Sequence, residues 1–140
     1  MQYWLFKSEP NTWSWEDQVA RGAAGEEWDG IRNYQARNNM RLMALGDRGF
    51  FYHSLTEKSV VGIVEVCALI HPDSTTDDAR WECVDIRAVG SMPTPVTLKM
   101  CKEEPALADM VLVNNTRLSV QPVTAPEWAK VCEMGGWTGD

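Results

Sequence analysis

The side chains best suited to binding a ligand are concentrated between Trp28 and Gly46. From Ile31 onward this stretch has three arginines and no acid, although the whole chain has 20 acidic and 13 basic residues. Read as a helix at about 100° per residue, it separates an apolar side from a polar side. The apolar side has Ala36, Met40 and Met43. The polar side has Tyr34, Arg37, Asn38 and Arg41.

The polar side combines an aromatic ring, amides and forked guanidinium donors. These groups suit a planar, hydrogen-bonding ligand that carries negative charge. The same side also fits an ordinary solvated surface, because most helices are amphipathic for packing alone. Trp28 before the helix and the aromatic run 50–52 after it favour the binding interpretation.

Two polar residues near predicted strand ends also suit a ligand. Lys7 could meet a phosphate as a point charge. Gln121 has the kind of amide that reads the edge of a base. Each also fits ordinary exposure on a sheet, so both interpretations stay open.

A catalytic interpretation depends on His53, which adjoins Ser54 and could pair with Glu9 as acid and base. No G-x-S-x-G turn accompanies it, and neighbours on a strand point to opposite faces. Neither a phosphate-binding glycine loop nor an H-E-x-x-H motif occurs. The four cysteines have no C-x-x-C pair. We therefore expect no metal and no cofactor.

Length and charge limit the class of partner. With 140 residues, the chain is expected to fold as one domain over residues 1–140. A net charge of −7 disfavours non-specific coating of nucleic acid. A local basic mouth is compatible with that charge, since fields are screened beyond about 8 Å in physiological salt. Without a recognisable signal peptide or membrane span, we expect a cytoplasmic protein, or a nuclear one in a eukaryote, that contacts no membrane.

Alternating, aromatic and β-branched stretches predict five or so strands. The expected strands are 2–7, 50–54, 60–70, 81–89 and 117–123. A bulge is expected at Gly62. Pro93 and Pro95 are expected to break the chain after the fourth strand, because proline removes a ladder donor.

Helix signals lie between the strands. Capping boxes at Ser14 and Thr124 mark two helix starts. The expected helices are 14–21, the central helix closing at Gly46, short turns over 97–102 and 107–112, and a last helix over 124–134. The link 22–25 is expected to be flexible. Without regular strand–helix alternation, the pattern favours a small mixed barrel or curled sheet over a doubly wound nucleotide fold.

Five motifs follow one another along nearly the whole chain. They are YWLFKSEP at 3–10, WDGIRNYQARN at 28–38, FYHS at 51–54, VGIVEV at 61–66 and RLSVQPV at 117–123. Together they resemble the EVE domain family, and the central motif is long enough to be highly specific. Departures from the family pattern occur at 48–49, 59–60, 22–27 and 135–140.

The resemblance implies a PUA-like α+β fold, a β-barrel-like mixed sheet of about five to six strands flanked by short helices. It also implies a non-enzymatic nucleic-acid-binding module. Such a module takes a flipped-out modified base, most directly a modified cytosine in DNA, into an aromatic and amide pocket. With Arg37 added from the polar helix side, the candidate ligand-binding residues are Lys7, Ser8, Glu9, Trp28, Arg32, Asn33, Tyr34, Arg37, Asn38, Tyr52, His53, Ser54, Ser119 and Gln121.

Each group has an expected role in a pocket between the central helix and the barrel. Stacking on the base is expected from Trp28, Tyr34 or Tyr52. Its donors and acceptors would be read by Asn33, Asn38 and Ser54. Flanking phosphates would be held by Lys7, Arg32 and Arg37. The expected protein is a monomer that binds modified DNA or RNA.

Three alternatives stay open at this point. The first is a small enzyme acting on nucleotides or modified bases, with His53 and Glu9 as acid and base. The second is an RNA-binding PUA-like module. The third is a protein-interaction module of the same shape.

Overall fold

The computed structural model of the protein describes residues 1–115 and 117–139. Its sheet has the strand order β2-β5-β4-β3-β1-β6. The strands are β1 (Tyr3–Ser8), β2 (Glu26–Glu27), β3 (Arg48–His53), β4 (Ser59–Pro72), β5 (Glu82–Thr97) and β6 (Val120–Val123). β1 and β3 run parallel, and the other neighbouring strands are antiparallel. The predicted α+β mixed sheet is confirmed, in an open form whose edges β2 and β6 are not neighbours.

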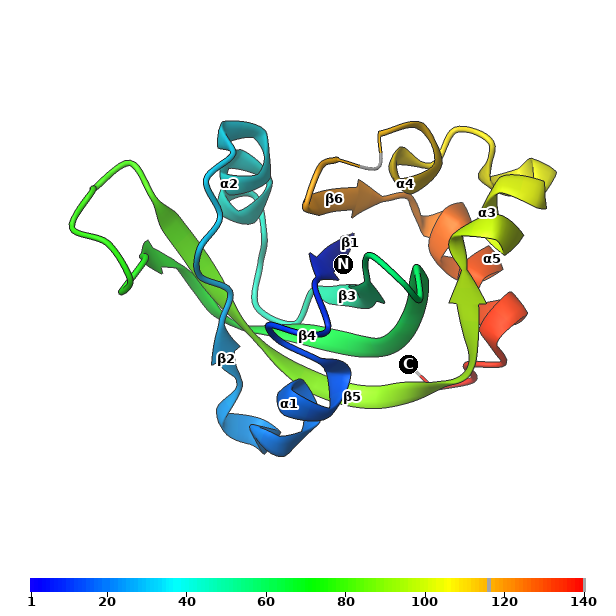
Figure 1. Ribbon diagram of the computed structural model, residues 1–140, viewed down its shortest axis with the longest axis horizontal. Coiled ribbons are helices and arrows are strands. Elements are labelled where there is room, and N and C mark those ends of the chain that lie inside the picture. Colours follow the sequence, from blue (N-terminus) through cyan, green and yellow to red (C-terminus); the bar gives the residue numbers. More distant parts are fainter. Residues whose placement is uncertain (116, 140) are drawn as a thin grey trace.

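Short helices flank the sheet. They are α1 (Trp15–Ala20), α2 (Tyr34–Arg41), α3 (Leu98–Glu103), α4 (Val111–Asn114) and α5 (Ala125–Gly135), with 3-10 turns η1 (Gly22–Ala24) and η2 (Pro105–Leu107). Both predicted capping boxes are present, at Ser14 and Thr124. In Figure 1, α2 lies on one side of β1 and β6, and α3, α4 and α5 gather on the other. Within the described residues, no helix is long and apolar enough to cross a membrane.

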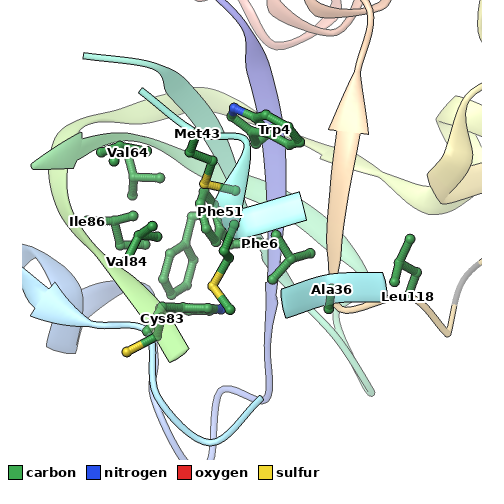
Figure 2. Close-up of a cluster of buried hydrophobic side chains, with 14 of the residues drawn as sticks. Trp4, Phe6, Ala36, Met43, Phe51, Val64, Cys83, Val84, Ile86 and Leu118 are labelled. Carbon is green, nitrogen blue, oxygen red and sulfur yellow. The ribbon is translucent and has the colours of Figure 1, made fainter. Parts of the chain in front are cut away.

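Two hydrophobic cores lie on opposite faces of the central strands. Trp4 and Phe6 of β1 belong to the first core, and Leu5 between them belongs to the second. Figure 2 shows Ala36 of α2 and Phe51 of β3 in the first core. Helices α3, α4 and α5 cover the second core. Because β1 is buried on both faces, it is held firmly, and so is the site beside its carboxyl end.

The central helix is shorter than predicted. α2 ends at Arg41, and the chain turns before β3 instead of remaining helical to Gly46. Beyond that end the backbone N–H of Ala44 donates to the buried side chain of Asp47, which replaces the helical ladder. The predicted sides are nevertheless confirmed. Ala36, Met40 and Met43 are buried, whereas Tyr34 is 47% exposed.

The sequence predicted that Pro93 and Pro95 break the chain, and this prediction is wrong, because β5 continues through them to Thr97. On β4, Val60 pairs with Val96, and Gly62 pairs with Ser91. Residues 92–95 are therefore bulged out of the β4–β5 ladder, where a missing N–H costs nothing. The predicted bulge at Gly62 is confirmed on β4, where the pairing with both β3 and β5 is irregular between Val60 and Gly62.

The link 22–25 is a fixed structure. It forms the 3-10 turn η1, after which Gly25 packs against β5. A Cβ atom at Gly25 would lie 2.7 Å from both the Cys67 sulfur and the Ile86 carbonyl oxygen. This close approach allows β2, which the sequence did not predict, to pair with β5. The link thus fixes the position of Trp28, which follows β2.

The second predicted helical turn, 107–112, is displaced. Pro105 begins η2 where a break was expected, and α4 starts only at Val111. Proline fits the first turn of a helix because its missing N–H would have no partner there. The last strand is also shorter than predicted, at Val120–Val123.

Candidate functional site

A pocket of about 400 Å³ opens beside the carboxyl end of β1. Its lining comes from the end of β1 and the turn after it, from β2, and from the extended stretch that leads into α2. The lining residues are Lys7, Ser8, Glu9, Thr12, Trp13, Glu26, Glu27, Trp28, Asp29 and Ile31. We call it the Trp28 pocket. It lies beside the entrance to α2, whereas the sequence predicted a slot between that helix and the sheet.

Two tryptophans give this pocket rigid apolar walls. The Trp28 backbone N–H donates to the Val84 carbonyl at 2.8 Å, and its ring packs edge-on against Phe6 and Phe51. Only 7% of Trp28 is exposed. The Trp13 indole N–H donates to the Gln18 side-chain oxygen at 2.9 Å. Both rings are thus fixed before any ligand arrives, which lowers the entropic cost of binding.

Carboxylates make the rest of the Trp28 pocket acidic. Glu9, Glu26, Glu27 and Asp29 line it, and Lys7 is the one base in its described lining. Burial, followed by the nearby charges of Asp73, Glu27 and Glu26, raises the pKa of Asp29. Carboxylates are acceptors only, so the pocket suits a ligand that presents N–H donors.

Asp73 holds the stretch that carries Trp28 and Asp29. The buried Asp73 carboxylate accepts hydrogen bonds from the Gly30 backbone N–H at 2.8 Å and from Arg32 at 3.0 Å. Gly30 has a φ of 77°, a left-handed conformation that favours glycine. Burial alone would raise the pKa of Asp73, but hydrogen bonds from Thr75, Gly30 and Arg32 lower it to about 2. Arg32 therefore positions the pocket wall and is already ion-paired.

The remaining candidates of the central motif lie on the outer side of α2. Tyr34 stacks on Trp81 with ring centroids 4.9 Å apart. The Arg37 guanidinium lies over the Tyr34 ring, with Cζ 4.8 Å from the ring centroid. It donates hydrogen bonds to the Arg80 carbonyl and to the Asn38 side-chain oxygen. The Asn33 side chain caps α2 through the Ala36 N–H. None of these four predicted ligand-binding residues, Asn33, Tyr34, Arg37 and Asn38, lines the Trp28 pocket.

A second pocket of about 570 Å³ adjoins the first and collects other candidates. Tyr52, Ser54 and Ser119 line it, and Lys7 and Glu9 line both pockets. Burial raises the pKa of Tyr52 to about 12. The Lys7 backbone N–H donates to the Ser119 carbonyl at 2.9 Å, which ties β1 to the segment before β6. We call this space the Tyr52 pocket.

Three predicted candidates are occupied by structural contacts. His53 is buried and accepts the Trp15 backbone N–H on Nε2 at 3.0 Å, while its Nδ1 faces Glu57 at 3.1 Å. Gln121 is fully buried and donates to the carbonyls of Asn115 and Leu118. The Ser8 hydroxyl donates to the Trp13 carbonyl and so shapes the pocket wall. The proposed acid–base partner Glu9 has no contact with His53 among the described hydrogen bonds.

Glu27, His71 and Cys83 place their donor atoms within 4.8 Å of one another. These atoms already have partners within the protein. Glu27 accepts hydrogen bonds from the Ser74 backbone N–H and hydroxyl, and His71 contacts Asp85 at 2.7 Å. Burial, then the Glu27 hydrogen bond and charge, raises the pKa of the Cys83 thiol, which opposes the thiolate that a metal requires. The cluster is explained as a polar contact between β2, β4 and β5.

Sequence reasoning missed several lining residues. Asp29 and Ile31 lie inside the motif from which candidates were chosen, between residues that were named. The one sequence signal for Trp13 is the high count of seven tryptophans in the chain, which does not say which ring lines a pocket. Lys58, Lys102 and Arg117 of the Tyr52 pocket come from three distant segments, and no spacing joins them.

Comparison with known proteins relates this architecture to a family. The model of the EVE domain matches residues 2–134. Human thymocyte nuclear protein 1 is 34% identical over 164 residues, covering 94% of this chain and 73% of that protein. The mouse protein of the same name is 35% identical over 158 residues, covering 90% of this chain and 70% of its own.

Solved structures agree with the fold. The crystal structure of Atu2648 from Agrobacterium tumefaciens has 62% sequence identity and a TM-score of 0.98, covering 100% of this chain and 97% of that one. The crystal structure of human THYN1 protein in complex with DNA containing 5-methylcytosine has 32% identity and a TM-score of 0.90, covering 96% and 98%. Match and architecture lead to one conclusion: the chain belongs to the EVE domain family.

Proposed function

We propose that this protein binds nucleic acid by accepting a flipped-out modified base, most directly a modified cytosine in DNA, in the Trp28 pocket. One observation carries the proposal: two fixed tryptophans and a set of carboxylates surround an open space of about 400 Å³. A similar protein, human THYN1, has a structure in complex with 5-methylcytosine-containing DNA, which supports this choice of ligand. The protein would act as a monomer and without catalysis.

The chemistry of the lining favours cytosine. Cytosine presents an exocyclic amino group, and Asp and Glu carboxylates accept from that group in known recognition. The carboxylates of Glu9 and Asp29 have no hydrogen-bond or ion-pair partner among the described residues, so they are available acceptors. Ile31 and the tryptophan rings offer apolar surface to a methyl substituent.

Base extrusion has a cost that these contacts must offset. Unstacking and unpairing a nucleotide costs a few kcal/mol. Stacking on an aromatic side chain contributes about 1–3 kcal/mol per base. A hydrogen bond to a charged group contributes about 1.5–3 kcal/mol. One ring and one carboxylate together therefore suffice to hold an extruded base.

The enzyme alternative has less support. Both ring nitrogens of His53 face structural partners, Trp15 and Glu57, and the residue lines neither pocket. A proton-transfer role would require it to leave the start of α1. The RNA alternative uses the same base chemistry, and the assay below separates it from DNA binding.

The test is calorimetry or fluorescence anisotropy with matched single-stranded oligonucleotides, DNA and RNA, that carry cytosine or 5-methylcytosine at one position. We expect tighter binding of the methylated DNA and no product after incubation. Asp29→Ala should weaken binding about tenfold or more, because it removes a charged acceptor. Asp109→Ala, at an exposed aspartate outside both pockets, is the matched control. Equal affinity for all four oligonucleotides would refute the proposed recognition of a modified base.

A further inference from the structure

The Tyr52 pocket is basic in a chain that is acidic overall. Lys7, Lys58, Lys102 and Arg117 line it, and Glu9 is the one acid in its described lining. The chain as a whole has 20 acids and 13 bases. Cations gathered close together repel one another, and an anion bound among them relieves that repulsion.

Most arginines of the chain are paired with a carboxylate, whereas within the described residues three bases of this pocket are not. Arg32, Arg41 and Arg87 each have a carboxylate within 3.0 Å. For Lys58, Lys102 and Arg117, by contrast, the described part of the chain provides no ion pair. Glu57 and Glu103 line a neighbouring groove with Lys58 and Lys102, beyond ion-pair distance. The charges of Lys58, Lys102 and Arg117 are thus available to an external partner.

Neutral donors complete the pocket. Tyr52 is 2% exposed, and its hydroxyl has no hydrogen-bond partner among the described residues. The Ser119 hydroxyl is likewise without one. Burial, followed by the charge of Lys58, lowers the pKa of Lys7, as expected where cations crowd together. Phosphate oxygens accept from hydroxyl, ammonium and guanidinium groups alike.

The two pockets meet at the end of β1. Lys7, near the end of β1, and Glu9, just after it, line both pockets, so the two spaces adjoin there. The acidic Trp28 pocket suits the amino edge of a base, and the basic Tyr52 pocket suits an anion. A nucleotide whose base occupies the first pocket would bring its backbone to the second.

We propose that the Tyr52 pocket binds phosphodiester groups of the same strand whose base enters the Trp28 pocket, with Lys58, Lys102 and Arg117 as the main contacts. This inference rests on the proposed function and adds the site that orients the strand. The sequence assigned the phosphates to Lys7, Arg32 and Arg37, and this proposal replaces the two arginines with three residues from other segments.

The test compares a ligand with phosphates and a ligand without them. The probes are a single-stranded DNA containing 5-methylcytosine and the free nucleoside 5-methyldeoxycytidine. The variants are Lys102→Gln and the double variant Lys58→Gln/Lys102→Gln. Lys130→Gln, which changes the charge equally and lines neither pocket, is the control for the single variant. Thermal unfolding confirms that each variant is folded.

The double variant should bind the oligonucleotide about tenfold more weakly, and its dependence of log K on log salt should fall by about 0.7 per lost phosphate contact. Nucleoside affinity should not change, and Lys130→Gln should match the wild type. An unchanged oligonucleotide affinity and salt slope would overturn the proposal. Inorganic phosphate that binds through Lys58 and Lys102 without competing with the oligonucleotide would also overturn it, in favour of a free-anion site.

Failure of the base-reading proposal looks different. In that case the wild type would not distinguish methylated from unmethylated DNA and would not bind the nucleoside. The double variant would still lose affinity and salt dependence if the phosphate site is real. The two proposals can therefore fail separately.

Discussion

The Trp28 pocket and the outer side of α2 both include residues of the motif 28–38, yet they use their polar groups differently. At the pocket, Asp29 and Glu9 have no partner within the described chain, and they face open space. On the outer side of α2, Arg32 is paired with Asp73, and Arg37 donates to Arg80 and Asn38. Polar groups therefore differ between the two regions in whether they already have a partner.

Polar groups that lack a partner and line a cavity are better candidates for ligand binding than groups that already have one. A ligand that approached the Tyr34 ring would have to compete with Trp81, which stacks on it, and with Arg37, which lies over it. A ligand in the Trp28 pocket displaces no side-chain contact of Asp29. Binding free energy is a difference between states, so groups already satisfied contribute little.

The largest expected difference between the two regions is in stability. Trp28→Ala should lower the free energy of unfolding by about 3–5 kcal/mol, because it empties a buried aromatic site against Phe6 and Phe51. Tyr34→Ala should cost no more than about 1.5 kcal/mol, since it removes one half-exposed stacking pair. Urea unfolding measures both. Equal losses would mean that the α2 stack is as much part of the core as Trp28.

The next effect concerns Asp73, which joins the two regions through Gly30 and Arg32. The pKa of Asp73 is lowered to about 2 in the folded state, against about 3.9 in an unfolded chain. This carboxylate therefore adds about 2 kcal/mol of stability above pH 4, and the contribution disappears as the pH falls through 2.

Asp73→Asn should thus be less stable than the wild type at neutral pH, with the difference shrinking between pH 4 and pH 2. Unfolding in urea across that range measures the difference, with Asp109→Asn as the exposed control. A difference that does not depend on pH would show that the loss comes from altered packing instead of the charge.

Much of this fold was predictable from local signals. The capping boxes at Ser14 and Thr124, the bulge at Gly62 and the buried side of α2 all depend on residues close in sequence. The errors came from tertiary contacts. The end of α2 depends on Asp47, and the path of β5 through two prolines depends on the bulge opposite β4.

The site was predictable in part for the same reason. The motifs 3–10 and 28–38 placed the end of β1 and Trp28 among the candidates, and both line the Trp28 pocket. The motif 28–38 also included Tyr34 and Arg37, because the sequence does not show that Trp81 and Arg80, in a loop about 45 residues away, contact them.

Base binding gives the third comparison. Trp13→Ala should weaken binding of 5-methylcytosine DNA about tenfold, since stacking on an aromatic side chain contributes about 1–3 kcal/mol. Tyr34→Ala should leave affinity nearly unchanged. Anisotropy titrations with one oligonucleotide compare the two variants directly. A larger loss for Tyr34→Ala would return the binding surface to the outer side of α2, where the sequence placed it.

The smallest expected effect belongs to Arg37, which the sequence assigned to a phosphate. Its guanidinium donates to the Arg80 carbonyl at 2.8 Å and to Asn38 while lying over the Tyr34 ring. Arg37→Gln should therefore change oligonucleotide affinity less than about twofold and leave the salt slope intact, whereas each lost phosphate contact lowers that slope by about 0.7. Titrations between 50 and 200 mM salt compare it with Lys102→Gln. A slope that falls for Arg37→Gln but not for Lys102→Gln would assign the strand to α2, because only a residue that releases counterions changes this dependence.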